Sequence, residues 1–244
     1  MPSYFRYVPQ FDYVSRVVGD TNISDYERTT NLFKRGKLRE DIFGNLQFFT
    51  KYSIIGDERP DNVAFKFYED ETLDWIILLS NNILNVFDEW PKTQRGFENY
   101  LKEKYSEVYR TKILRAKDRS IILSEEEAFQ ETLADVHHYE TIQVKNSLGV
   151  TVVPEGLIVA QNYSVNFYDP TDKAQRILSG ITKPVTNYEY ESKIEDEKRN
   201  IFILKPRYLN VVLEDMERIM KYKEGSTQFV SETLKKGDNI RLYD

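Results

Sequence analysis

The two histidines of the chain, His137 and His138, are adjacent, and they are the side chains best suited to acid–base or metal chemistry. Neighbouring residues on a helix point about 100° apart, so such a pair rarely binds one metal ion. A catalytic triad would also need a carboxylate to orient one of the rings. We therefore interpret them as a pair at the end of a helix that interacts favourably with the helix dipole.

Carboxylates are numerous, with 40 Asp and Glu residues, but no spacing singles out a catalytic pair. The segment "SEEEAF" from Ser124 offers ligands for a metal ion, yet the helix dipole favours acidic residues in any first turn. None of the ten glycines fits a phosphate-binding or dinucleotide loop, and no hydrolase or zinc-protease motif is present. The sequence therefore predicts no enzyme, no catalytic residue, no cofactor and no metal site.

The composition indicates a soluble globular protein with one large domain or two small ones. Of its 244 residues, 40% are hydrophobic and 30% charged, and the net charge of −6 argues against nucleic-acid binding. No signal segment and no apolar run long enough for a membrane span is visible, and the absence of Cys fits intracellular folding. The 17 Tyr and 14 Phe residues suit protein interfaces, although an ordinary aromatic core explains them as well.

The N-terminal residues 3–17 place four aromatic residues at multiples of two, which is strand periodicity. Pro9 argues against a central strand, so we expect an edge strand or an extended arm that gains order mainly in an assembly. Residues 19–44 are polar and weakly periodic, and we expect them to be irregular. The four aromatic residues, Phe5, Tyr7, Phe11 and Tyr13, are candidate contacts to a partner protein.

Residues 48–82 predict a strand, a helix, a short acidic turn and a second helix. Pro60 suits a first helical position, Thr72 is a plausible N-cap, and Asn81 with Asn82 can end the second helix. That helix, "LDWIILL", is apolar almost all round and needs cover on every side. We expect the first helix and its sheet to cover one side, and Trp90, the helix with Phe97 or a partner subunit to cover the other. Further contact candidates are Trp75, Leu78, Leu79 and Trp90.

The second half of the chain predicts two more helices, an antiparallel sheet, a hairpin and a last helix. One helix starts at Thr93, and another starts at the Ser124–Glu127 capping box with Val136 on its buried face. The β-branched residues after Tyr139 predict a small sheet, "YEYES" and "IFILK" a hairpin, and Pro206 a last helix. The fold class is thus α+β, in four segments: 1–47, 48–115, 116–185 and 186–244.

The C-terminal segment "ETLKKGDNIRLYD" alternates in a way that places Ile240 and Leu242 on one face of a strand. We expect this strand to pair either with "TKYSII" of the same chain or with an edge on a neighbouring subunit. A frayed polar tail is the alternative.

Residues 48–82 resemble the lysin motif, a small βααβ module. "GDERPDNVAFKFY" stands where that family has Gly-Asp, Ile/Val-Ala and Tyr, and "LDWIILLSNN" where it has Leu and a terminal Asn. The tail residues Leu234, Gly237, Ile240 and Leu242 resemble its closing strand. The usual second strand does not follow Asn82 directly, because "ILNVFDEWP" is short and ends at Pro91.

Two longer stretches, residues 48–110 and 186–220, resemble the lysin-motif-bearing baseplate wedge subunits of T-even-type contractile-tailed bacteriophages, the products of tail gene fifty-three. The resemblance implies a structural protein that clamps wedge subunits together around the hub. Its expected partners are other wedge subunits, namely wedge core proteins and a sheath-initiator-type protein, in multiple copies of a six-fold assembly. It also implies no nucleic-acid partner and no membrane insertion. The expected location is the virion tail baseplate, assembled in the host cytoplasm. The alternatives are a peptidoglycan-binding lysin motif and a metal-dependent hydrolase.

Overall fold

The computed structural model describes residues 4–14, 26–171, 173–225 and 229–236. It has an α+β fold, as expected, and divides into two compact units. Unit 1 comprises Met1–Trp90 with Arg199–Asp244, and unit 2 comprises Pro91–Lys198. Unit 2 is thus an insertion between two parts of the sequence that fold together.

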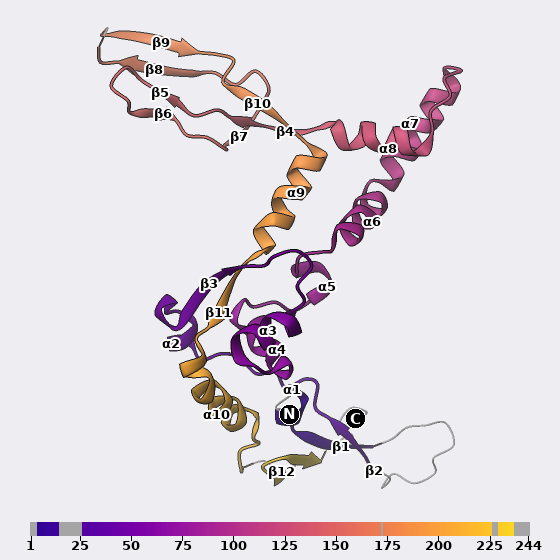
Figure 1. Cartoon of the computed structure of the whole chain (residues 1–244), viewed down its shortest axis with the longest axis vertical. Coiled ribbons are helices and arrows are strands. Elements are labelled where there is room, and N and C mark those ends of the chain that lie inside the picture. The colour runs from indigo at the N-terminus through magenta and orange to yellow at the C-terminus, as the bar shows by residue number, and fades with distance from the viewer. Residues whose placement is uncertain (1–3, 15–25, 172, 226–228, 237–244) are drawn as a thin grey trace, which may run out of the picture. The chain divides into compact units, whose positions relative to one another are not determined.

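The centre of unit 1 is a two-stranded antiparallel sheet with two helices. Strand β3 (Phe49–Ser53) is followed by α3 (Pro60–Tyr68), the 3₁₀ turn η2 (Glu71–Leu73) and α4 (Asp74–Ser80). The second strand is β11 (Asn200–Leu204), which pairs along the whole of β3 (Figure 1). The order is βααβ, with more than a hundred residues between α4 and β11.

Local signals explain the ends of these helices. Pro60 occupies the first turn of α3, and Asn81 and Asn82 end α4, Asn82 with a left-handed φ of 54°. Thr72 is not the N-cap of the second helix, contrary to the sequence prediction. The side chain of Asp70 accepts the backbone N–H of Thr72 and starts η2 instead, because the chain first makes a 3₁₀ turn before α4.

Asn81 also fastens α4 to the closing strand. Its side-chain amide donates to the carbonyl oxygen of Phe202 at 2.9 Å, and its side-chain oxygen accepts the N–H of Phe202 at 2.7 Å. The hydroxyl of Tyr68, at the end of α3, donates to the carbonyl oxygen of Leu204. Both helices are therefore tied to a strand that is remote in sequence.

A second layer of unit 1 packs below this module. It contains α10 (Leu209–Met220), preceded by the 3₁₀ turn η3 (Pro206–Tyr208), and three short helical elements: α1 (Tyr4–Tyr7), α2 (Glu40–Phe43) and η1 (Leu46–Phe48). Gly36 lies so close to α10 that an added Cβ would be 2.2 Å from the sulfur of Met216. The predicted last helix is confirmed, and its residue Ile219 is 40% exposed.

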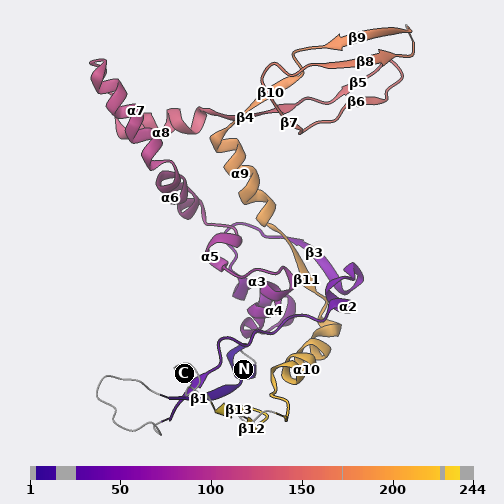
Figure 2. The same ribbon diagram turned by 180° about the vertical axis from the view of Figure 1, so that it is seen from behind.

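The N-terminal strand is central, which corrects the prediction of an edge strand or arm. Strand β1 (Gln10–Val14) pairs with β2 (Tyr26–Thr30) and, in parallel, with β13 (Leu234–Lys236). The sheet order is β12-β13-β1-β2, with β12 (Phe229–Ser231) at one edge (Figure 2). Pro9 does not prevent this, because it precedes the strand and only its carbonyl oxygen is used, by Asn31. Residues 19–44 are accordingly not all irregular.

Unit 2 begins with three helices, α6 (Gln94–Lys104), α7 (Ser106–Asp118) and α8 (Glu125–Ala134). Thr93 caps α6, and Ser124 with Glu127 forms the predicted capping box of α8. The short helix α5 (Val86–Glu89) belongs to unit 1. Val136 is not on the buried face of α8, because that helix ends two residues earlier and Val136 is 47% exposed.

The expected antiparallel β-rich segment is present in three small sheets. Strand β4 (Val136–Thr141) lies between β10 (Thr182–Thr186) and β7 (Ile158–Val159). Two hairpins complete the segment, β5 (Val144–Lys145) with β6 (Thr151–Val153) and β8 (Val165–Asp169) with β9 (Ala174–Leu178).

The predicted hairpin of "YEYES" and "IFILK" is wrong. "YEYES" lies in α9 (Asn187–Lys198), and "IFILK" supplies β11, whose partner is β3. The capping pair Thr186 and Glu189, with a side-chain to backbone contact in each direction, starts α9. The sequence "TNYE" carries this helix-start signal, and it outweighs the alternating tyrosines.

Candidate protein-interaction surface

An apolar groove of about 790 Å³ lies in unit 1 along the outer side of α4; we call it the α4 groove. Side chains from α1, from the segment after β2, from α4 and from the turn that follows α4 line it. Its large apolar side chains include those of Phe5, Leu32, Trp75, Leu78, Leu79 and Leu84.

The structure brings four of the predicted contact residues together in the α4 groove. Trp75, Leu78 and Leu79 come from α4, and Phe5, which is 65% exposed, comes from α1. Trp75 itself is buried, with the rings of Tyr4 and Tyr7 each 5.8 Å away. The aromatic N-terminus therefore covers one side of the apolar helix and leaves the groove beside it.

The other candidates lie elsewhere. Trp90 is buried against α3 and β11 in a separate cluster, and its indole N–H donates to the carbonyl oxygen of Glu58. Phe11 is half-buried on β1, and Tyr13 is on the same strand with a side chain outside the described part. Ile240 and Leu242, with the strand predicted for them, lie outside the described residues. That the N-terminal aromatic residues gain order in an assembly stays a prediction.

The exposed leucines of the groove were not predicted from the sequence. Leu32 is 72% exposed and Leu84 is 62% exposed, and the adjacent Phe33 is 95% exposed. Large apolar residues inside polar stretches, "TNLFKR" and "NNILN", were the available signal. Each alone is ordinary on a protein surface, and only their proximity makes a patch.

Charged side chains border the groove. The ammonium of Lys34 donates to the carbonyl oxygens of Met220 and Lys221, and burial lowers its pKa. Burial raises the pKa of Asp74, although the N–H of Trp75 donates to this carboxylate. An apolar floor with a few polar groups at its rim suits a protein side chain better than it suits reaction chemistry.

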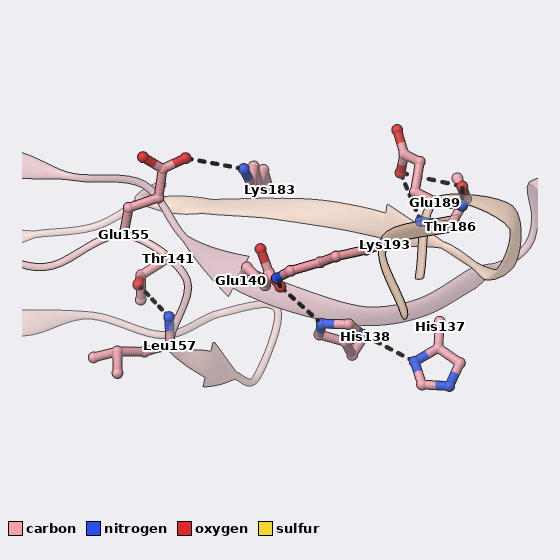
Figure 3. A network of polar contacts seen from close by, with 10 residues as sticks. All are labelled: His137, His138, Glu140, Thr141, Glu155, Leu157, Lys183, Thr186, Glu189 and Lys193. Carbon is pink, nitrogen blue, oxygen red and sulfur yellow. Dashed lines mark hydrogen bonds and ion pairs between the residues drawn. The ribbon is translucent and has the colours of Figure 1, made fainter. Parts of the chain in front are cut away.

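The histidine pair forms a polar network on a strand and not at a helix end, because α8 ends at Ala134 and both residues lie in β4 (Figure 3). Their Nδ1 atoms are 2.8 Å apart, and Nε2 of His138 is 3.3 Å from a carboxylate oxygen of Glu140. Burial would raise the pKa of Glu140, but hydrogen bonds from His138 and Lys193 outweigh it and lower that pKa. The network connects β4 to α9.

Within the described ranges, no group of three His, Cys, Asp or Glu side chains is placed to hold a metal ion. None of the helices in this part of the chain is long and apolar enough to cross a membrane.

Part of the chain is similar to a known protein family. Residues 4–118 match the family described as Base plate wedge protein 53, and this range contains every residue of the α4 groove. No curated protein matches the chain. Residues 4–118, a little under half of the chain, are therefore similar to the Base plate wedge protein 53 family.

Proposed function

We propose that this protein is a non-enzymatic structural component of a contractile-tail baseplate wedge, and that it clamps wedge subunits together around the hub. The family match supports the baseplate role. The observation that carries the clamping role is the α4 groove, where an ordered scaffold exposes several large apolar side chains side by side. Monomeric proteins rarely leave such patches uncovered, and they mark interaction sites.

The groove has enough apolar surface to hold a partner. Fully burying one Leu or Phe side chain contributes about 1.5–3 kcal/mol. Phe5, Leu32 and Leu84 each expose more than 60% of their surface. Burial of these three side chains by a partner therefore contributes several kcal/mol of favourable free energy. This offsets part of the entropic cost of association.

The proposed partners are other wedge subunits, among them the wedge core proteins and a sheath-initiator-type protein. The proposal includes multiple copies in a six-fold assembly, a place in the virion tail baseplate and assembly in the host cytoplasm. It includes no nucleic acid, no cofactor and no membrane insertion.

The test is incorporation into wedges when the chain is co-expressed with the other baseplate proteins. Leu32→Asp and Leu84→Asp place a charge in the groove, and we expect each to reduce co-purification at least about tenfold, because a desolvated charge costs more than 1.4 kcal/mol. The matched control is Ile177→Asp on β9, a residue also 72% exposed but outside the groove. Normal incorporation of both groove variants contradicts the proposal.

A peptidoglycan-binding lysin motif is the second candidate, and one observation favours it. Strand β11 completes a βααβ module with β3, α3 and α4, so the second strand missing from the adjacent sequence is supplied from further along the chain. Saturable binding to purified peptidoglycan supports this candidate if changes at Gly56 and Asp57 abolish it. If the protein binds peptidoglycan no better than it binds control beads, this candidate is excluded.

A further inference from the structure

Unit 2 carries a second groove, distinct from the α4 groove. It has a volume of about 660 Å³ and lies between α6, α8 and the start of α9; we call it the α6–α8 groove. Its apolar wall includes Phe97 and Tyr188, whose ring centroids are 6.3 Å apart, and Tyr188 is 47% exposed.

The rim of the α6–α8 groove is acidic. Among the described residues that line it are three carboxylates, from Glu98, Glu126 and Glu189, and one ammonium, from Lys102. Lys102 pairs with Glu126 at 3.4 Å. Hydrogen bonds from Thr186 lower the pKa of Glu189, so this carboxylate stays ionised at neutral pH.

The end of α7 is basic, in contrast to the acidic rim of the groove. We call residues 115–122 the α7 tip. It exposes two isoleucines, Ile121 at 57% and Ile122 at 99%. Beside them are three exposed cations, Arg115, Lys117 and Arg119, and one carboxylate, Asp118. No described residue forms an ion pair with any of the three cations.

The α7 tip is held in an ordered turn. Ser120 adopts a left-handed φ of 60°, and the N–H of Ile121 donates to the carbonyl oxygen of Ala116 across the turn. This is the geometry with which a helix end satisfies its last carbonyls. The isoleucines are therefore presented by a shaped end of the helix, which lowers the entropy lost on docking.

We propose that the α7 tip of one copy of this protein docks into the α6–α8 groove of a second copy, with the isoleucines on the apolar wall and the cations facing the acidic rim. The tip does not line the groove of its own chain. The rings of Tyr109 and Phe129 also pack together, with their centroids 5.9 Å apart, and this contact holds α7 against α8. These contacts exclude the same molecule as the occupant, and the opposite charges of the tip and the rim favour a second copy.

The two surfaces differ, so the contact is heterologous, and repetition of it arranges copies head to tail in a ring or a filament. One helix end in one groove is smaller than a standard interface of about 1,600 Å². We therefore expect a Kd on the order of 0.1–1 mM for the isolated contact. Copies held next to one another by a larger assembly would make the contact at high effective concentration.

The absence of Cys from the chain makes disulfide trapping a clean test. Full-length Ile121→Cys protein is mixed with full-length Gln130→Cys protein at about 0.5 mM, near the expected Kd, under mild oxidation. Gln130 is exposed on α8 and lines the groove. The control pair is Ile121→Cys with Lys51→Cys, because Lys51 is an exposed position on β3 outside the groove. A disulfide requires Cα atoms within about 7 Å, so we expect the groove pair to give at least fivefold more mixed dimer than the control pair. Equal yields overturn the proposal.

A pair of charge-reversal substitutions distinguishes specific docking from non-specific association. Arg119→Glu, added to the Ile121→Cys chain, should lower the yield of mixed dimer severalfold, and Glu98→Lys in the Gln130→Cys chain should restore it. Both sites are exposed, so folding is preserved. An unchanged yield with Arg119→Glu, or a loss that Glu98→Lys does not restore, overturns the proposal. The wedge incorporation test changes residues of the α4 groove only. The proposed clamping function and the proposed contact between copies can therefore be contradicted independently of each other.

Discussion

The sheets β3–β11 and β8–β9 are both antiparallel and two-stranded, but they differ in burial. In β11, Ile201, Ile203 and Leu204 are at most 4% exposed, because helices and the neighbouring core cover the pair. In β9 no residue is buried, and Ile177 is 72% exposed. Strands far apart in sequence thus form a deeply buried sheet, and a local hairpin forms a largely exposed one.

Unit 2 adds a polar contact to its apolar core. Apolar side chains pack around β11 and α10 in unit 1 and between α6, α7 and α8 in unit 2. In unit 2, the buried carboxylate of Glu191 in α9 accepts hydrogen bonds from Lys104 at 2.5 Å and Tyr105 at 3.0 Å near the end of α6. Burial and this contact raise the pKa of Tyr105 to about 12. A polar contact of this kind specifies one arrangement of two helices but adds less stability than a packed core.

The largest expected effect comes from truncating the closing strand. Ile203→Ala removes a fully buried side chain from β11, and we expect it to lower the free energy of unfolding by about 2–5 kcal/mol. Ile177→Ala on β9 is the matched change on an exposed strand, with an expected effect within about 0.5 kcal/mol. Urea denaturation of both variants measures the contrast, and equal losses would mean that the hairpin is also covered.

A smaller effect is expected at the polar contact of unit 2. Glu191→Gln removes the charge that holds Lys104 and Tyr105, and it should cost about 1.5–3 kcal/mol, the range for hydrogen bonds to charged groups. Glu197→Gln, an exposed change on the same helix, is the control and should be nearly neutral. Thermal unfolding compares the two; a Glu191→Gln protein as stable as the control would show that α9 is held by other contacts.

A methyl group at Gly36 would meet the ends of two methionine side chains in unit 1. Gly36→Ala pushes a methyl group into Met216 and Met220, and we expect a loss of about 1–3 kcal/mol from this overpacking. Adding Met216→Ala to the same chain should remove the clash, so the double variant should lose less than the sum of the single changes. Additive losses in urea denaturation would exclude this steric explanation.

The smallest expected effect is the acid sensitivity of the β4–α9 network. The pKa of Glu140 is lowered in the folded protein, so the stability from this group is present above the unfolded pKa and is lost as the pH falls through the folded pKa. We expect stability to decline below about pH 4.5 and expect Glu140→Gln to flatten part of that decline. Identical pH profiles for the two proteins would contradict this assignment.

The sequence by itself determined the local features of the protein. Pro60, the Ser124–Glu127 capping box and Asn82 act within a few residues of their own positions, and each predicted helix boundary there is confirmed. The α+β class and the β-rich segment also follow from short-range patterns. The helix α9 was missed because the alternation of "YEYES" was given more weight than the capping pair at Thr186 and Glu189.

Only the tertiary structure decided which distant segments meet. The partner of β3 begins at Asn200, and no local pattern indicates a pairing across the whole of unit 2. The α4 groove likewise needs α1, residues 32–35 and the end of α4 in one place. The physical reason is that capping and turn formation depend on the backbone groups nearby, whereas long-range pairing depends on which apolar surfaces remain to be covered once the local elements exist.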